Sequence, residues 1–269
     1  MPNGKLTFIG LGLFDEKDIS LKGLEEIKKS DKVYAEFYTA KLVGTSIEKI
    51  EKNIGKKIIV LTRDETEKAD KIINLALKEN IVFLTCGDPM SATTHVDLRL
   101  RAINKGIETN IIHGSSIFTA VPGLLGLQNY KFGRTTTLAY PEKNYFPTSP
   151  YDVIKDNKKM GLHTLVLLDI QADKNRYMTA NEAMTLLLKM EEKKKKNLFN
   201  MNSIICIVTR AGSNQPVVVA GTIKELIKKD FGSPLHTLVI PGKLHFMEVE
   251  ALEKLAQLPA QQIIKIQKL

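Results

Sequence analysis

The 269-residue sequence has few cysteines and no long hydrophobic run. Its two cysteines, Cys86 and Cys206, each lie within an apolar stretch, a pattern typical of buried, reduced thiols. No Cys/His spacing typical of zinc occurs, so we expect no metal site. No apolar run approaches the roughly 18–20 residues of a membrane-spanning helix, and the first residues do not resemble a signal peptide. These absences predict a soluble protein of the cytoplasm with no membrane partner.

Motifs for phosphate binding and acyl transfer are also missing. The sequence contains neither a GxxxxGKS/T P-loop nor a GxSxG nucleophile elbow. Gly10 and Gly12 follow an apolar run, as in a dinucleotide-binding turn, and Glu36 lies where an acid would bind a ribose. The third glycine of that turn is absent, which disfavours an NAD-dependent oxidoreductase.

The formal net charge of +9 indicates an acidic partner, either nucleic acid or an acidic protein. Part of this charge lies in the segment KMEEKKKKN (189–197), which is typical of a solvated helix end. Charge alone does not distinguish the two partners. A non-catalytic RNA-binding module would carry basic strands interleaved with aromatic residues, or a known RNA motif. The sequence has neither, so we expect no direct binding to nucleic acid.

The first part of the chain alternates apolar runs with helical patterns. Helices are predicted over 20–29, 65–79 and 92–104, and Thr45 to Glu48 form a capping box that opens a short helix. This alternation predicts an α/β domain, residues 1–113, with a mainly parallel sheet covered on both faces. The predicted strands are 5–11, 32–38, 56–61, 81–86 and 109–113.

The second part, residues 114–269, has a different pattern and predicts a second α/β domain with a mixed sheet. A connecting helix over 115–127 is predicted to be interrupted at Pro122 and Gly123. A capping box at Thr179 opens a long helix to about Lys193, and a last helix begins near Phe246. Two strands separated by a short turn form an antiparallel hairpin. The predicted strands are 134–140, 163–170, 203–212, 216–221 and 236–242.

The ends of the strands carry the residues that indicate a binding site. An apolar strand at 81–84 runs into a Gly87-Asp88-Pro89 turn, and the segment FIGLGLFD (8–15) forms a second such end. Open α/β sheets bind small molecules at the carboxyl ends of their strands. The strand-ending segments are rich in glycine, hydroxyl and apolar residues and poor in cations, which does not suit a polyphosphate. Such a lining suits S-adenosylmethionine, with its adenosine, sulfonium and amino-acid groups.

These segments resemble the tetrapyrrole-methylase class of S-adenosylmethionine-dependent methyltransferases, and within it the diphthine synthase family. The resemblance covers nearly the whole chain and, from its length, the archaeal type of member. It implies a two-domain tetrapyrrole-methylase-like α/β fold, with a mostly parallel amino-terminal sheet, a mixed carboxyl-terminal sheet and helices on both faces. The similar segments are FIGLGLFDEKDIS (8–20), AEFYT (35–39), GDPMSATTH (87–95), YKFG (130–133), GLHTLVLLDI (161–170), YMTANEA (177–183), RAGS (210–213) and PGKLH (241–245).

The family resemblance also implies a reaction. Its members methylate, and in archaeal types trimethylate, the amino group of the 3-amino-3-carboxypropyl-histidine of translation elongation factor 2 in diphthamide biosynthesis. They form homodimers, with the cofactor in the cleft between two domains, and release S-adenosylhomocysteine. A methylase acting on a corrin or porphyrin precursor is the alternative within the class, but it would lack the YMTANEA and PGKLH segments.

By the same resemblance, the contacts to S-adenosylmethionine fall on eight residues. Ser91 stands where an apolar residue is expected, which a main-chain contact would tolerate. No general base is assigned, because methyl transfer from a sulfonium depends mainly on positioning. Aromatic faces at Tyr34, Phe37, Tyr38 or Tyr140 are candidates for holding a trimethylammonium group. The eight implied contacts are Leu13, Asp88, Ser91, Ser116, Ile117, Leu168, Ala211 and His236.

Overall fold

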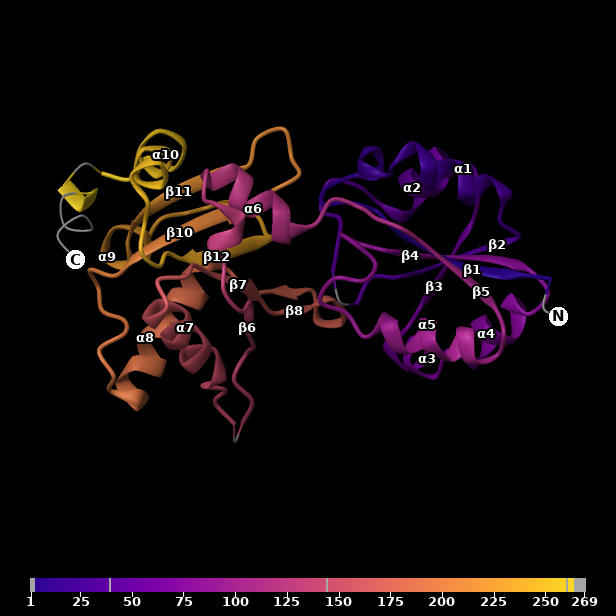
Figure 1. The fold of residues 1–269 in the computed structure, drawn as a ribbon, viewed down its shortest axis with the longest axis horizontal. Helices are drawn as coiled ribbons and strands as arrows, with labels where there is room; N and C mark the ends of the chain where they lie inside the picture. Colours follow the sequence, from indigo (N-terminus) through magenta and orange to yellow (C-terminus); the bar gives the residue numbers. More distant parts are fainter. Residues whose placement is uncertain (1–2, 39, 144, 260, 264–269) are drawn as a thin grey trace. The chain divides into compact units, whose positions relative to one another are not determined.

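The computed structural model describes residues 3–38, 40–143, 145–259 and 261–263 (Figure 1). Thr39, the last residue of the AEFYT segment, and the two ends of the chain therefore lie outside the described residues. The chain divides into two compact units, Met1–Ile117 with Gln171–Asn175, and Phe118–Ile170 with Arg176–Leu269. The domain division predicted at residues 113 and 114 stays a prediction. No helix within the described ranges is long and apolar enough to cross a membrane.

The first unit contains a five-stranded sheet in the order β3-β2-β4-β1-β5. All of its strand pairs are parallel, which confirms the predicted parallel sheet. The central strands β1 and β4 are buried along almost their whole length, as expected for a sheet covered on both faces. The strands are β1 (Lys5–Gly10), β2 (Lys32–Glu36), β3 (Ile58–Leu61), β4 (Asn80–Thr85) and β5 (Glu108–Ile112).

Helices cover both faces of this sheet, as predicted (Figure 1). Successive side chains of a strand point to opposite faces, so Ile9 and Leu84 join one core cluster while Phe8 and Phe83 join another. The first cluster packs under α1 and α2, and the second under α4 and α5. The helices are α1 (Leu21–Lys29), α2 (Ile47–Ile54), α3 (Arg63–Lys68), α4 (Asp70–Ala76) and α5 (His95–Asn104), with a short 3-10 turn η1 (Glu16–Asp18).

The single helix predicted over 65–79 is wrong, because the chain forms α3 and α4 with a break at Ala69. Ala69 is buried and adopts the left-handed conformation, with φ of 48°. Arg101 of α5 donates hydrogen bonds to the carbonyl oxygens of Glu67 and Lys68, which lie at the end of α3. A cation from a helix distant in sequence therefore satisfies the carbonyl groups that the break releases.

Three further helix boundaries differ from the prediction. The α2 helix is capped by Ser46, whose hydroxyl accepts from the Lys49 N–H, while the Thr45 hydroxyl donates to Glu16 at 2.5 Å. The α5 helix begins at His95 instead of residue 92, because Ala92 is left-handed with φ of 53°. The α6 helix (Ile117–Leu125) continues through Pro122 without the predicted interruption.

The second unit contains a five-stranded sheet in the order β11-β10-β12-β7-β6. Only the β6–β7 pair is parallel, and β10 and β11 form the predicted antiparallel hairpin, so the predicted mixed sheet is confirmed. Short strands β8 (Ile170–Gln171) and β9 (Arg176–Tyr177) flank a 3-10 turn, η3 (Ala172–Lys174). The sheet strands are β6 (Thr136–Leu138), β7 (Thr164–Leu168), β10 (Ile204–Thr209), β11 (Val217–Thr222) and β12 (His236–Ile240).

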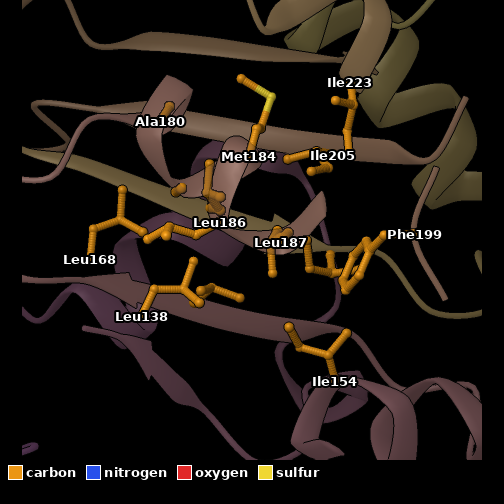
Figure 2. Packing of buried hydrophobic residues seen from close by; sticks show 14 of the residues in the cluster. Leu138, Ile154, Leu168, Ala180, Met184, Leu186, Leu187, Phe199, Ile205 and Ile223 are labelled. Carbon is orange, nitrogen blue, oxygen red and sulfur yellow. The ribbon is translucent and has the colours of Figure 1, made fainter. Parts of the chain in front are cut away.

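One large apolar core lies between this sheet and two helices. Figure 2 shows Leu138 and Leu168 of the sheet facing Met184 and Leu187 of the long helix α8, with Ile154 of α7 beside them. The helix α10 packs instead against β11, on the opposite side (Figure 1). The helices are α7 (Ser149–Lys159), α8 (Ala180–Lys194), α9 (Ile223–Leu226) and α10 (Phe246–Ala256), with a 3-10 turn η2 (Asn129–Lys131).

A buried carboxylate, Glu248, joins three of the segments that carry the family resemblance. Its Oε1 accepts from the Gln128 N–H and from His163 Nε2, each at 3.0 Å. Its Oε2 accepts from the His245 N–H at 2.8 Å and from the Lys131 ammonium. The segments YKFG, GLH (161–163) and PGKLH therefore meet at one fully buried charge at the end of the sheet where β7 begins. Their role here is to connect η2, β7 and α10.

The hydrogen bonds to Glu248 shift its titration. Burial raises the pKa of this carboxyl, but the donors from His245, Lys131, Gln128 and His163 outweigh burial and hold the pKa at about 2. The folded-state pKa thus lies below the ordinary value of about 4.3. The bonds contribute their full stability above that ordinary value, and the contribution is lost as the pH falls toward 2.

Replacing Glu248 should destabilise the second unit in a pH-dependent way. Glu248→Gln should cost about 3 kcal/mol of unfolding free energy at pH 7, because it leaves the donors of Lys131 and His163 poorly paired. The difference from the unsubstituted chain should shrink by about 1 kcal/mol at pH 3.5, where the carboxylate of the unfolded chain is already protonated. Urea unfolding at the two pH values measures both quantities. Glu250→Gln, an exposed carboxyl two residues along the same helix, is the control, and equal effects of both substitutions at both pH values would contradict this account.

Candidate functional site

The candidate site in the first unit lies where the sheet reverses its direction of winding. The strands β1 and β4 are neighbours, but the chain leaves β1 toward α1 on one face and leaves β4 toward α5 on the other. Figure 1 shows these two helices on opposite faces. Adjacent strands whose connections diverge in this way leave a crevice at their carboxyl ends, where open α/β sheets bind ligands. The segments predicted to bind are those that follow β1, β4 and β5.

Four glycines, at the ends of β1, β4 and β5, allow these strand ends to approach closely. The Gly87 N–H donates to the Gly12 carbonyl at 2.7 Å, and the Gly12 N–H donates back to Gly87 at 3.3 Å. A Cβ atom on Gly10 would lie 2.4 Å from the Gly87 oxygen, and one on Gly114 would lie 2.5 Å from it. Gly87 itself has φ of 72° and nothing within 4 Å of its Cβ position. The main chain at Gly87 is therefore open on the side where a side chain would point.

The loop that carries Leu13 is held by one carboxylate. Asp18 Oδ2 accepts from the N–H groups of Leu13 at 3.0 Å, Phe14 at 2.7 Å and Asp15 at 3.4 Å. These bonds fold the FIGLGLFDEKDIS segment back on itself directly after β1. Leu13 is half-buried, so part of its side chain is available as an apolar wall.

Asp88 is largely occupied by neighbouring groups. Its Oδ1 accepts from the Met90 N–H at 3.0 Å and the Ser91 hydroxyl at 3.2 Å, and its Oδ2 lies 2.6 Å from His113 Nδ1. Burial raises the pKa of the Asp88 carboxyl, but the bonds from Met90 and His113 outweigh burial and leave the pKa below its ordinary value. The side chain of Ser91 thus serves the Asp88 turn.

His113 is the residue of this edge that the sequence interpretation missed. It follows β5 directly and is exposed. The signal that identifies it is its position at the end of a parallel strand, on the same edge as Asp88. Ser116 and Ile117, both half-buried, follow a few residues later, where α6 begins.

Beneath this edge lies a buried acid–histidine pair. Glu36, at the end of β2, is 1% exposed, and its carboxylate lies 3.6 Å from His95 Nε2. Burial lowers the pKa of His95, although Glu36 acts in the opposite direction. Burial also raises the pKa of the nearby Cys86 thiol, with Glu36 adding to the effect. The idea that Glu36 binds a ribose is therefore wrong, because its carboxylate faces the core.

In the second unit, the strand register brings the predicted residues to one edge of the mixed sheet. Thr209 at the end of β10 lies opposite His236 at the start of β12. Continuing the register of β12 against β7 places His236 opposite Leu168. Ala211 follows β10 by two residues and is half-buried. Leu168, Ala211 and His236 thus gather at the end of the sheet opposite to the Glu248 network.

Both ring nitrogens of His236 form hydrogen bonds within the protein. Its Nδ1 accepts from the Ala180 N–H at 3.1 Å, so Nε2 carries the proton and points at the carbonyl oxygens of Gly232 and Ser233. Burial lowers the pKa of His236, which keeps the ring neutral. Arg210 Nη1 donates to the Ser233 carbonyl at 2.7 Å, fixing the same loop. A ligand contact of His236 would therefore use its main chain.

Most of the aromatic rings predicted to hold a trimethylammonium group already pack against other side chains of the protein. Tyr34 is 1% exposed and belongs to the core of the first unit, so its proposed role is wrong. The Tyr140 ring has the Arg176 guanidinium 3.5 Å from its centroid, and the Tyr38 ring has Arg63 at 5.2 Å. Phe37 packs against the core beneath α1 and α2. Among the described residues, no group of three or more His, Cys, Asp or Glu side chains is placed to hold a metal ion.

Comparisons with known proteins agree with this geometry. The family model of the tetrapyrrole (corrin/porphyrin) methylases matches residues 5–227. The chain therefore belongs to the tetrapyrrole methylase family.

Similar proteins define the branch of that family. A diphthine synthase of Methanococcus maripaludis is 57% identical over 93% of this chain and 98% of its own length, and one of Methanococcus vannielii is 55% identical over the same shares. A crystal structure of a diphthine synthase, 41% identical, superposes with a TM-score of 0.88 and covers 96% of this chain and 98% of that one. Within the tetrapyrrole methylases the chain is a member of the diphthine synthase family, and it is an S-adenosylmethionine-dependent methyltransferase. The predicted family and two-sheet α/β fold are thereby confirmed.

The main chains of Gly10, Gly87 and Gly114 meet at this edge (the glycine junction), and a side chain on Gly10 should damage it. Gly10→Ala should cost about 1–3 kcal/mol of unfolding free energy, because its Cβ would press on the Gly87 carbonyl. It should also weaken binding of S-adenosylmethionine, measured by calorimetry. The matched control is Gly123→Ala in α6, where nothing lies within 4 Å of the added atom. That substitution should stabilise the chain by about 0.5–1 kcal/mol. Wild-type stability and binding in Gly10→Ala would show that the close approach is unimportant.

Proposed function

We propose that this chain transfers methyl groups from S-adenosylmethionine to the amino group of the 3-amino-3-carboxypropyl-histidine of translation elongation factor 2. The product is diphthine, in diphthamide biosynthesis, after three successive methylations. The observation that carries the proposal is the high identity with diphthine synthases over nearly the full length of both chains. The notable departure, Ser91, donates its hydroxyl to Asp88 Oδ1 and its N–H to the Asp88 carbonyl, so a main-chain contact with a ligand would use its carbonyl oxygen.

The residues at the two sheet edges fit the proposed cofactor. S-adenosylmethionine supplies a methyl group on a positively charged sulfur. Leu13 and Ile117, both half-buried, offer apolar surface for its adenosine and methionine arms. The Leu168 side chain lies in the core, so a contact of this residue with the cofactor would use its main chain. Ala211 is small enough to let the main chain approach the adenine. The open main chain at Gly87 lets a ligand come close to the end of β4. We propose that S-adenosylhomocysteine is released after each transfer.

The chain's contribution to the reaction is chiefly positional. The acceptor nitrogen must lie behind the methyl carbon, in line with the bond to sulfur, and such alignment lowers a barrier by about 7–11 kcal/mol. A rigid frame serves this purpose. The Asp18 hydrogen bonds fix the loop that carries Leu13, and the Arg210 hydrogen bond fixes the loop that precedes His236. We further propose, from the family resemblance, a homodimer located in the cytoplasm.

Methyl transfer to elongation factor 2 is the direct test. Incubation with methyl-labelled S-adenosylmethionine and factor carrying the unmethylated 3-amino-3-carboxypropyl arm should place label on the modified histidine. Mass spectrometry should show mono-, di- and trimethylated forms in succession. Factor without the arm is the control and should remain unlabelled. Label on a corrin or porphyrin precursor, with none on the factor, would favour the alternative within the family.

The contribution of the second unit to the cofactor site can be tested at Ala211. Ala211→Leu should weaken binding of S-adenosylmethionine about tenfold, because the larger side chain fills the space proposed for the adenine. Calorimetry measures the dissociation constant directly, without the protein substrate. Gln215→Leu, an exposed position in the same loop between β10 and β11, is the matched control and should bind normally. Unchanged affinity in Ala211→Leu would remove this residue from the site.

A further inference from the structure

We propose that His113, held by Asp88, accepts the proton that the acceptor ammonium group must lose before each methyl transfer. The proposal rests on the proposed function and adds to it a catalytic residue. It assigns Asp88 the role of a positioning residue for the imidazole.

Asp88 holds the Nδ1 side of the His113 imidazole, and the rest of the ring is exposed. His113 Nδ1 lies 2.6 Å from Asp88 Oδ2, and Asp88 Oδ1 is bound by the Met90 N–H and the Ser91 hydroxyl. The Asp88 side chain is only 10% exposed, whereas that of His113 is 73% exposed. The carboxylate is thus anchored in the turn after β4, and the imidazole extends from it toward solvent.

This arrangement selects the tautomer that a proton acceptor needs. An ionised carboxylate accepts hydrogen bonds and donates none, so the proton of a neutral His113 resides on Nδ1. The lone pair is then on Nε2, the nitrogen away from Asp88. Among the described residues, the bond to Asp88 is the one hydrogen bond that this imidazole makes. Nε2 is therefore available to a substrate.

His113 also lies at the right place in the first unit. The next residue, Gly114, belongs to the glycine junction, since its nitrogen would lie 2.6 Å from a Cβ on Gly10. The imidazole therefore stands at the carboxyl edge where β1, β4 and β5 end, beside the opening at Gly87. This is the edge at which the fold predicts ligand binding.

The other described histidines do not meet these conditions. His163 and His236 have both ring nitrogens bonded within the second unit. His95 is 2% exposed beneath the sheet edge. His245 is exposed but caps α10, at the end of the second sheet remote from Leu168 and His236.

The proposed step is a proton transfer to His113 followed by a methyl transfer to the nitrogen. The acceptor enters as a primary ammonium group, and one of its N–H bonds breaks as the proton moves to His113 Nε2. The nitrogen lone pair then forms a bond to the methyl carbon while the carbon–sulfur bond breaks and its electron pair stays on sulfur. The exposed imidazolium passes its proton to water and is ready for the next transfer. Three methylations therefore release three protons and leave a quaternary ammonium group.

The test removes the imidazole and supplies it again from solution. His113→Ala should slow methyl transfer to elongation factor 2 by about a hundredfold, the usual effect of losing a general base. Its affinity for S-adenosylmethionine, measured by calorimetry, should stay within about twofold of the unsubstituted chain. Added imidazole should restore a substantial part of the rate, and more basic imidazoles should restore more.

Two further variants separate catalysis from structure. His113→Gln keeps an N–H donor that can reach Asp88 but has no basic nitrogen, so it should be as slow as His113→Ala. His245→Ala, an exposed histidine of the second unit, is the matched control and should keep full activity and show no effect of imidazole.

Several outcomes would overturn the proposal. Full activity in His113→Gln would show that the residue only supports the turn. Loss of cofactor affinity without rescue by imidazole would make His113 a binding residue and not a base. A failure of the proposed function is distinct, because the unsubstituted chain itself would then leave elongation factor 2 unmethylated.

Discussion

The close approach of three main-chain segments at Gly10, Gly87 and Gly114 is the constraint on which the first unit depends. Only glycine permits the Gly87 carbonyl to lie against both neighbouring strand ends. That approach brings the turns after β1, β4 and β5 to one edge, and with them Leu13, Asp88 and the segment leading to α6. A carboxylate then fixes each turn, since Asp18 binds the amides around Leu13 and Asp88 binds its own turn and His113.

In the second unit, strand register and the hydrogen bonds of His236 position the residues at the edge of the sheet. Its mixed sheet places Leu168 and His236 in register, and a neutral imidazole joins the amino terminus of α8 to the 232–233 loop. At the other end of the sheet, Glu248 holds η2, the segment before β7 and the residue that caps α10 through donors from four residues. The Glu248 network and the edge that carries Leu168 and His236 thus lie at opposite ends of one sheet.

Much of the fold was predictable from the sequence. Alternation of apolar runs and helical patterns predicted the parallel sheet, because buried parallel strands are apolar throughout. The hairpin after β10 followed from its short turn. Two of the errors came from contacts distant in sequence. The break at Ala69 depends on Arg101, and the cap of α2 moved to Ser46 because Thr45 binds Glu16. No local pattern records either partner.

The sequence by itself determined the family, the two-sheet plan and the segments that end strands, because these are set by local periodicity and by motifs read in order along the chain. Only the tertiary structure decided what each side chain does. It turned Glu36 into the core, engaged both nitrogens of His236, placed the YKFG and PGKLH segments around a buried charge, and set His113 against Asp88. These outcomes depend on which strands become neighbours, and residues 25 positions apart, such as Asp88 and His113, meet only when the sheet forms.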